Sequence, residues 1–281
     1  GGIIFIPIIL LVWLLSGVDS PLYLSLTVIS LLAISFLDDI RSISAGVRFI
    51  FHIISILIFV LYLDITLNFF YLGIIVLFLV WMSNLFNFMD GSDGMAAGMA
   101  VIGFFSYAIA SYMAGDFSFA LENGIIMMCS LGFLFFNFSP AKIFMGDVGS
   151  ISLGFLAGAM GIIGWQKEIW TFWFPLLIFS PFIIDATTTL LKRILKREKF
   201  WQAHRGHYYQ RLVLLGWSHK KTALVLYVVM ICLALISFYI NNDDYNKLIL
   251  AIILFFYSLS MLYIDKIWKD YLLNNRNFDN K

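Results

Sequence analysis

Residues 69–114 read FFYLGIIVLFLVWMSNLFNFMDGSDGMAAGMAVIGFFSYAIASYMA, and this stretch decides the fold. Two apolar runs flank a short polar turn, MDGSDG, at residues 89–94. Each run approaches the roughly 20 residues that an α-helix needs to cross a bilayer. A carboxylate beside hydrocarbon is costly, so Asp90 and Asp93 are candidate functional residues between two membrane helices.

The rest of the chain repeats this pattern. Of its 281 residues, 62% are hydrophobic and 12% are charged, about half the charge of a soluble domain. The apolar runs are continuous, whereas the strands of a membrane β-barrel alternate. We therefore predict one all-α domain over residues 1–281, a polytopic transmembrane helical bundle. Ten spans are predicted, at about residues 3–16, 21–37, 47–63, 69–86, 96–114, 121–138, 150–164, 170–190, 222–240 and 247–264.

Basic residues gather in alternate loops. These loops are residues 38–46, 87–95, 139–149 and 191–221, together with the tail after residue 264. Counting bordering residues, they hold 16 of the 18 Lys and Arg, and the positive-inside rule places them in the cytoplasm. We expect these loops to form the active site. The aspartates that share this face are Asp38, Asp39, Asp90, Asp93 and Asp147.

Asp38 and Asp39 close the second predicted span. Two adjacent acids at a helix C-terminus oppose the helix dipole, which is mildly unfavourable. One interpretation is structural, a solvated loop start that pairs with Arg41 or Arg48. The other is catalytic, with one carboxylate orienting a metal or base and the other accepting a proton. The sequence leaves both open.

The segment from Asn84 to Gly94 is the strongest local signal. Its glycines permit positive φ and close approach of a ligand beside Asn87, Asp90 and Asp93. Irregular backbone at membrane depth is tolerated where it lines a cavity. An ordinary Asx turn is the structural alternative, but the crowding of polar side chains favours a functional role.

Asp147 lies in FMGDVGS, residues 144–150, just before a predicted helix. The free N–H groups of a helix N-terminus suit a phosphate. Asp147 is a metal-ligand candidate or a plain helix cap. Phe144 either stacks on a base or packs at the membrane interface.

The segment His204–Arg211, HRGHYYQR, lies in the long basic loop. On a helix, His204, His207 and Arg211 would share one face. A protonated imidazole and a guanidinium suit a diphosphate. The alternative is a basic juxtamembrane segment that binds anionic lipid headgroups.

Two other polar residues lie inside predicted spans. Asp185 either pairs with a cation of the basic loop for structure or serves function. His52 is more readily interpreted as a hydrogen-bonded core residue than as a ligand. Cys129 and Cys232 are interpreted as small buried hydrophobes, without a disulfide or metal role.

Taken in order, these motifs resemble the polyprenyl-phosphate N-acetylhexosamine-1-phosphate transferases, which form glycosyltransferase family 4. This superfamily includes phospho-MurNAc-pentapeptide translocase and the undecaprenyl-phosphate GlcNAc-1-phosphate transferases. The resemblance covers nearly the whole chain. The matching motifs are Gly1-Gly2, Asp38-Asp39, Asn87–Gly94, Gly146–Ser150 and His204–His207.

The histidine segment, followed by Gly216-Trp-Ser-His219, looks closest to the O-antigen-initiating branch. Two features depart from the family pattern. Ser92 stands where Leu is usual, and ten spans are predicted where the family has eleven. We expect that the family's first span and leading cytoplasmic segment are missing here, from a truncated N-terminus.

The resemblance implies transfer of a phospho-N-acetylhexosamine from a UDP-sugar to undecaprenyl phosphate, with release of UMP. It implies Mg²⁺ at Asp147, with Mn²⁺ as a substitute. Asp38 would be the acid or base, Asp39 would support the metal site, and Asn87 and Asp90 would order it. The residues expected to contact substrate are Asp93 at the nucleoside, Phe144 stacking on uracil, and His204, Arg205 and His207 at the diphosphate or sugar.

The resemblance also implies a multi-pass protein of the bacterial inner membrane, with its active site facing the cytoplasm and no nucleic-acid partner. It would begin synthesis of O-antigen or a related envelope glycan, and a homodimer is expected. The identity of the sugar stays open.

Three rivals are considered. A proton- or ion-coupled secondary transporter also uses broken helices and intramembrane acids, but its acids would lie at the midplane. A non-catalytic scaffold leaves the acids unexplained. A CDP-alcohol phosphatidyltransferase would need an acid ladder that does not continue after Asp90-Gly91.

Overall fold

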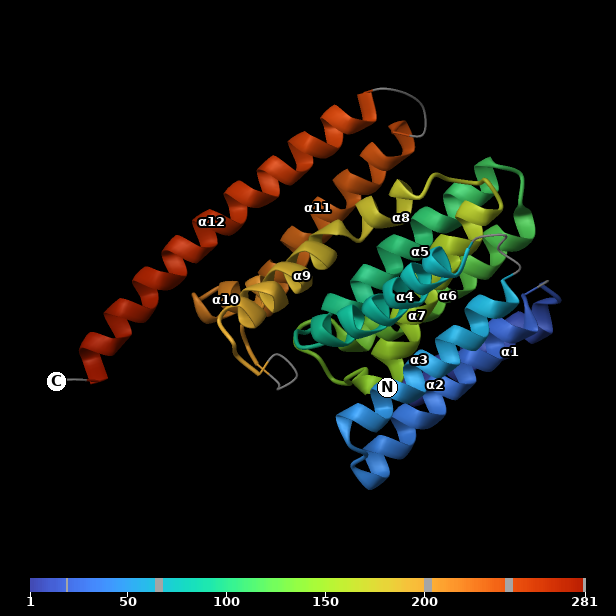
Figure 1. Ribbon diagram of the computed structural model, residues 1–281, viewed down its shortest axis with the longest axis horizontal. Coiled ribbons are helices and arrows are strands. Elements are labelled where there is room, and N and C mark those ends of the chain that lie inside the picture. Colours follow the sequence, from blue (N-terminus) through green and yellow to red (C-terminus); the bar gives the residue numbers. More distant parts are fainter. Residues whose placement is uncertain (19, 64–67, 200–203, 241–244, 280–281) are drawn as a thin grey trace.

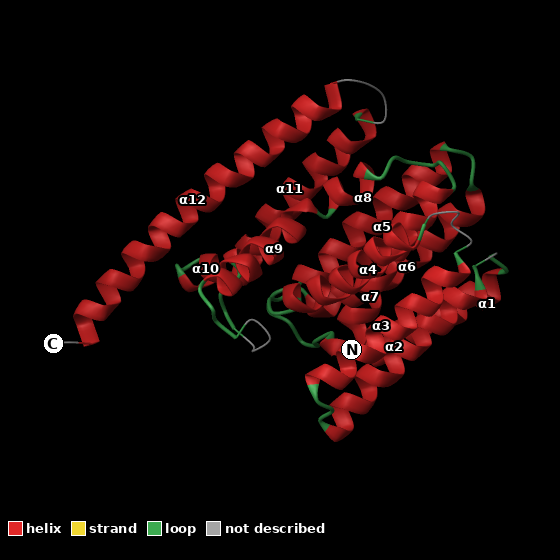
Figure 2. Cartoon of the chain, in the orientation of Figure 1, coloured by secondary structure: helices red, strands yellow, loops and turns green. Residues whose placement is uncertain are grey.

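The computed structural model describes residues 1–281 except 19, 64–67, 200–203, 241–244 and 280–281. Every regular element in the described part is a helix (Figure 2). Without water in the hydrocarbon, a spanning segment must satisfy its own backbone hydrogen bonds, which a helix does. The helices are α1 (Gly2–Ser16), α2 (Leu22–Arg41), α3 (Ala45–Tyr62), α4 (Phe69–Met89), α5 (Met95–Met113), α6 (Phe117–Asn137), α7 (Gly146–Gln166), α8 (Trp173–Ile178), α9 (Ser180–Leu195), α10 (Tyr208–Leu214), α11 (His219–Tyr239) and α12 (Tyr245–Asp279).

The predicted fold class, a polytopic helical bundle, is confirmed. Within the described residues, eight helices are long and apolar enough to cross a membrane, and α1 is a shorter apolar helix. The eighth predicted span, residues 170–190, differs because it is divided into α8 and α9. Pro181 sits in the first turn of α9, where a residue without a backbone N–H starts a helix but does not continue one.

Helix α7 is the centre of the bundle. Of its 18-residue apolar window, 94% is buried, against 33% for α2 and 22% for α3. Glycine allows this close packing: a Cβ on Gly154 would lie 2.4 Å from the Met82 carbonyl oxygen of α4. Small residues of this kind let helix backbones approach inside a membrane. The buried α7 therefore fixes the position of its own N-terminal turn, which carries Asp147.

The later helices form a second group beside this centre. Figure 1 shows α9, α10 and α11 along one side of α4–α7, with α12 outermost. None of the apolar window Leu248–Leu273 of α12 is buried within the chain. Large apolar side chains cover the outer surfaces of the bundle, as expected where lipid is the solvent.

Candidate active site

Arg48 joins two of the predicted site aspartates. Its Nη1 lies 2.5 Å from Asp38 Oδ2 and 2.9 Å from Asp147 Oδ2. Asp38 is in the last turn of α2, Arg48 in the first turn of α3 and Asp147 in the first turn of α7. The structural interpretation of Asp38-Asp39 expected an ion pair with Arg41 or Arg48, and the pair with Arg48 is present. The sequence did not predict that the same guanidinium also reaches Asp147.

Helix dipoles make these two carboxylates unequal. Asp147 at a helix N-terminus is favoured, whereas Asp38 at a C-terminus is opposed and gains from the nearby guanidinium. Asp39, the neighbour of Asp38, is exposed. Asp38 and Asp39 therefore belong to the end of a helix and not to the predicted loop 38–46.

Asp90 is the C-cap of α4 and lies against the start of α7. Its Oδ2 accepts a hydrogen bond of 3.1 Å from Gly146 N. Burial, reinforced by the negative charge of Asp147, raises the pKa of Asp90 from 3.8 to about 7, although the Gly146 N–H opposes the shift. At neutral pH, Asp90 is close to its titration midpoint, which suits a group that exchanges protons.

The acidic turn is tied to the loop that carries Phe144. Asp93 Oδ2 accepts from Ala141 N at 3.2 Å, and Asn137 Oδ1 accepts from Gly94 N at 3.1 Å. Asn137 Nδ2 in turn donates to the Ile143 carbonyl at 2.9 Å. The turn and this loop therefore form one hydrogen-bonded unit, and Asn137 is a residue that the sequence analysis missed.

Ser92, the departure from the family pattern, has a partner. Its hydroxyl is 2.7 Å from His219 Nδ1 at the start of α11. Ser92 is buried, so a polar group there needs such a partner. The contact fastens the acidic turn to α11.

The histidine segment packs against the end of α4. The His207 ring stacks on Phe88 at 5.5 Å and on His204 at 4.9 Å between centroids. Tyr209 donates its hydroxyl to the Phe88 carbonyl at 2.7 Å. These contacts place His207, with His204 stacked on it, beside Phe88 at the end of α4, next to the acidic turn.

Asp185 anchors this segment from inside α9. Its Oδ1 accepts from Tyr208 N at 2.9 Å and its Oδ2 from Tyr209 N at 3.0 Å, which caps α10. His207 Nδ1 lies 3.4 Å from Asp185 Oδ1. Asp185 therefore meets the basic loop through backbone amides, whereas the structural interpretation expected a cation as its partner.

The two histidines differ in environment. His207 is 2% exposed, whereas His204 is half-buried and Arg205 is exposed. Burial, with the nearby His207, Arg193 and Arg211, lowers the pKa of His204 to about 4. His204 is therefore neutral at pH 7 before an anion arrives, and a neutral imidazole still has one N–H to donate.

Arg211 does not face the site. Its Nη1 donates to Asp265 Oδ1 of α12 at 2.8 Å. Phe144 is 67% exposed and Asn87 is half-buried in the last turn of α4. Phe144 is therefore accessible to a ligand, while the guanidinium of Arg211 is already paired with Asp265.

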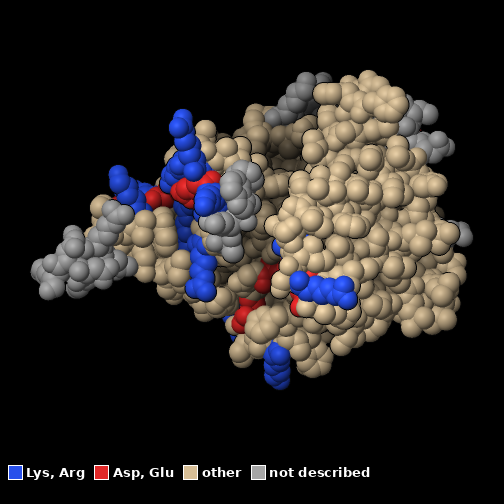
Figure 3. Space-filling view, turned by 60° about the horizontal axis from the view of Figure 1, so that its bottom comes forward, with Lys and Arg blue, Asp and Glu red and all other residues tan. Residues whose placement is uncertain are grey.

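Acidic side chains lie in a recess of the surface. Figure 3 shows acidic side chains within a hollow of this face, with basic side chains around them and uncharged surface beyond. Asp38, Asp90 and Asp147 come from the ends of three helices and meet through Arg48 and Gly146. Such a recess can receive a charged ligand beside a hydrocarbon surface.

The donor set of this recess fits Mg²⁺. Carboxylate oxygens are the protein ligands that Mg²⁺ prefers, and Mg²⁺ is held through one or two carboxylates plus phosphates and water. Asp147, whose side chain is 38% exposed at the N-terminus of α7, supplies one such group. Within the described residues, no three His, Cys, Asp or Glu gather as a metal cluster, and a site of this kind does not require one.

Comparisons with known proteins agree with the motifs. The profile of Glycosyl transferase family 4 matches residues 21–165. A Bacillus subtilis protein described as a probable undecaprenyl-phosphate N-acetylglucosaminyl 1-phosphate transferase is 31% identical over 215 residues, covering 71% of this chain and 60% of that protein.

Two further relatives are phospho-N-acetylmuramoyl-pentapeptide-transferases. That of Halalkalibacterium halodurans is 31% identical over 64% of this chain and 54% of its own length. That of Staphylococcus epidermidis is 33% identical over 63% of this chain and 54% of its own length. The chain thus aligns with 54–60% of the length of these relatives.

Proposed function

The chain belongs to glycosyl transferase family 4, and from this premise we propose that it transfers a phospho-N-acetylhexosamine from a UDP-sugar to undecaprenyl phosphate. The products are undecaprenyl-diphospho-sugar and UMP. Two relatives are named as a probable undecaprenyl-phosphate N-acetylglucosaminyl 1-phosphate transferase and a phospho-N-acetylmuramoyl-pentapeptide-transferase. The observation that carries the proposal is the meeting of Asp38, Asp90 and Asp147 at the ends of α2, α4 and α7.

In this proposal a lipid-phosphate oxygen attacks the β-phosphorus of the UDP-sugar, and the bond from that phosphorus to the bridging oxygen of UMP breaks. Mg²⁺, or Mn²⁺ in its place, supplies charge neutralisation on the diphosphate when bound. Asp147 would hold the metal, and Asp39 would support the metal site. Asp38 would orient or deprotonate the lipid phosphate, and Arg48 keeps Asp38 and Asp147 in their relative positions.

The nucleotide would lie along the turn and its partner loop. Asp93 and Asn137 brace the loop on which Phe144 is exposed, so Phe144 is available to stack on uracil. Asn87 and Asp90 would keep the end of α4 in register with α7. These roles need one rigid unit, which the hydrogen bonds across the turn provide.

His204, Arg205 and His207 would serve the diphosphate or sugar. Arg205 is exposed and carries a charge, and His204 is accessible. His207 is buried against Phe88 and contributes by supporting His204. An arriving anion would raise the pKa of His204 from about 4 and so strengthen its hydrogen bond.

The site would face the cytoplasm of a bacterial inner membrane, where UDP-sugars are available. The gathering of basic residues in loops on this side supports that orientation. The product would begin a surface polysaccharide such as O-antigen or another envelope glycan. The sugar would be of the N-acetylglucosamine or 6-deoxyhexosamine class.

Isotopic labelling tests the reaction. The chain in lipid nanodiscs would receive undecaprenyl phosphate, Mg²⁺ and UDP-GlcNAc, UDP-GalNAc or a UDP-6-deoxyhexosamine labelled in the β-phosphate. The proposal predicts that the label enters the organic-extractable lipid while UMP stays in water. Label that remains in water with every donor would contradict the proposal and favour the transporter alternative.

The transporter alternative retains one favourable observation, the break between α8 and α9, since discontinuous helices also bind transported ions. Against it, the residues at the break are Phe179, Ser180 and Pro181, none of them ionisable. Donor-independent proton uptake into vesicles would support it.

A further inference from the structure

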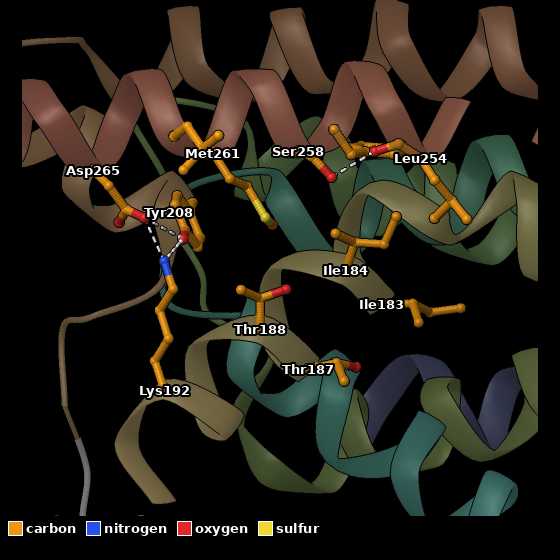
Figure 4. A pocket seen from close by; sticks show the side chains of 12 residues that line it. Ile183, Ile184, Thr187, Thr188, Lys192, Tyr208, Leu254, Ser258, Met261 and Asp265 are labelled. Carbon is orange, nitrogen blue, oxygen red and sulfur yellow. Dashed lines mark hydrogen bonds and ion pairs between the residues drawn. The ribbon is translucent and has the colours of Figure 1, made fainter. Parts of the chain in front are cut away.

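Helix α12 is attached to the rest of the chain at polar points. Tyr257 approaches Ser180 of α9, with 3.1 Å between the hydroxyl oxygens. Further along α12, Asp265 contacts Lys192 of α9 and Tyr208 of α10. Between these points lies an apolar cavity of about 500 Å³ (Figure 4). Because none of its apolar window is buried within the chain, α12 meets α9 and α10 through polar contacts such as these.

Asp265 is the centre of a charged cluster. Its carboxylate accepts from Lys192 Nζ, from Arg211 Nη1 at 2.8 Å and from the Tyr208 hydroxyl at 3.2 Å. Figure 4 shows Lys192 and Tyr208 converging on this carboxylate. One acid therefore serves two cations, which would repel each other without it.

Arg211 links this cluster to the histidine segment. While Nη1 binds Asp265, its Nε donates to the Gly206 carbonyl at 2.8 Å. The side chain is 14% exposed, and its guanidinium lies 4.8 Å from the centroid of the Tyr208 ring. A planar guanidinium held at both edges and against a ring has little freedom to turn.

Gly206 lies between the residues proposed to contact substrate. His204 and Arg205 precede it and His207 follows it. Gly206 N also donates to His204 Nδ1 at 3.1 Å, so a shift of Gly206 carries the imidazole with it. The position of α12 is thereby transmitted to His204 through three hydrogen bonds, Asp265 to Arg211, Arg211 to Gly206 and Gly206 to His204.

We infer that Asp265 is a positioning residue for the reaction: through Arg211 it holds Gly206 and so sets where His204 and Arg205 face the recess. The inference rests on the proposed function for its kinetic consequence. Its structural consequence, an ordered segment 204–211, stands without that function. Because His204 and Arg205 are proposed to bind the UDP-sugar, a shift of Gly206 would weaken that binding, so such a distant residue can matter.

The first test measures backbone order without substrate. Hydrogen–deuterium exchange would compare wild type, Asp265→Asn and Asp270→Asn in nanodiscs. Asp270 is an exposed acid of the same helix and serves as the matched control. Loss of one charge-assisted hydrogen bond predicts about tenfold faster exchange across residues 204–211 in Asp265→Asn alone. Unchanged exchange there would overturn the inference, whether or not the chain is a transferase.

The second test separates positioning from general damage. In the transferase assay, Asp265→Asn is expected to raise KM for the UDP-sugar about tenfold and to leave KM for undecaprenyl phosphate unchanged. Asp265→Glu is expected to restore part of the loss. A fall in kcat with both KM values unchanged would indicate a smaller folded fraction and would overturn the positioning role.

A second variant covers the case in which Asp265→Asn does not fold. Arg211→Lys keeps a positive charge beside Asp265, but its ammonium group lacks the planar guanidinium that binds Asp265 and Gly206 together. The same faster exchange and the same selective rise in KM are expected. Wild-type values for both quantities in Arg211→Lys would contradict the link through Gly206.

Discussion

Asp38 and Asp147 share one guanidinium nitrogen, Arg48 Nη1, at 2.5 and 2.9 Å. The sharing joins the last turn of α2 to the first turn of α7, the most buried of the candidate spans. It brings together two carboxylates that the proposal assigns to the lipid phosphate and to the metal. Arg48 is thus the residue whose removal most directly separates these two roles.

Arg48→Ala is expected to lower UMP release by about 10- to 100-fold, the usual effect of removing a group that orients metal or catalytic ligands. Arg48→Lys should lie in between, since an ammonium keeps the charge but not the planar fork. Arg41→Ala, an exposed arginine at the end of α2, is the control. Equal activity of the Arg48 and Arg41 variants would show that the shared contact has no catalytic importance.

Asp90 predicts a dependence of stability on pH. Because its pKa is raised from 3.8 to about 7, the folded chain keeps a proton that the unfolded chain loses between about pH 4 and 7. Its stabilising contribution is full at low pH and is lost as pH rises through 7. Relative to Asp90→Asn, the Tm of wild type should therefore fall between about pH 4 and pH 7. Parallel Tm profiles of the two proteins would disprove the raised pKa.

Asp185 predicts a stability effect without a metal or substrate. In Asp185→Ala two buried amides, Tyr208 N and Tyr209 N, lose their acceptor. The expected loss in free energy of unfolding is about 2 kcal/mol or more, measured by equilibrium unfolding in mixed micelles. Asp185→Asn keeps one acceptor oxygen and should lose less. A free energy of unfolding for Asp185→Ala equal to that of wild type would refute the capping role.

Hydropathy predicted the membrane helices because a helix that crosses the hydrocarbon of a bilayer needs a continuous run of apolar residues. It did not predict the break between α8 and α9, although Pro175 and Pro181 are a sequence signal for it. The family resemblance assigned roles to the acids, and these roles stay predictions. That Asp90 and Asp147 come close depends on Gly146, whose backbone N–H bonds to Asp90.

The sequence alone did not predict which charged side chains pair between distant helices. Arg48 with Asp147, and Asp265 with Arg211, depend on how helices distant in the chain are rotated against one another. Periodicity in a single helix indicates which face is apolar, but not which polar side chain of another helix it meets. Arg211 illustrates this limit, because its spacing suggested a phosphate ligand and its partner is Asp265.

UMP release by Asp147→Asn tests the central claim most directly. The assay would contain the chain in nanodiscs, undecaprenyl phosphate, Mg²⁺ and the donor that gives the highest rate. Asp116→Asn, which alters an acid paired with Lys167 away from the recess, is the matched control. The account predicts that Asp147→Asn abolishes Mg²⁺-dependent UMP release while Asp116→Asn keeps it. Near-normal UMP release by Asp147→Asn would contradict the account.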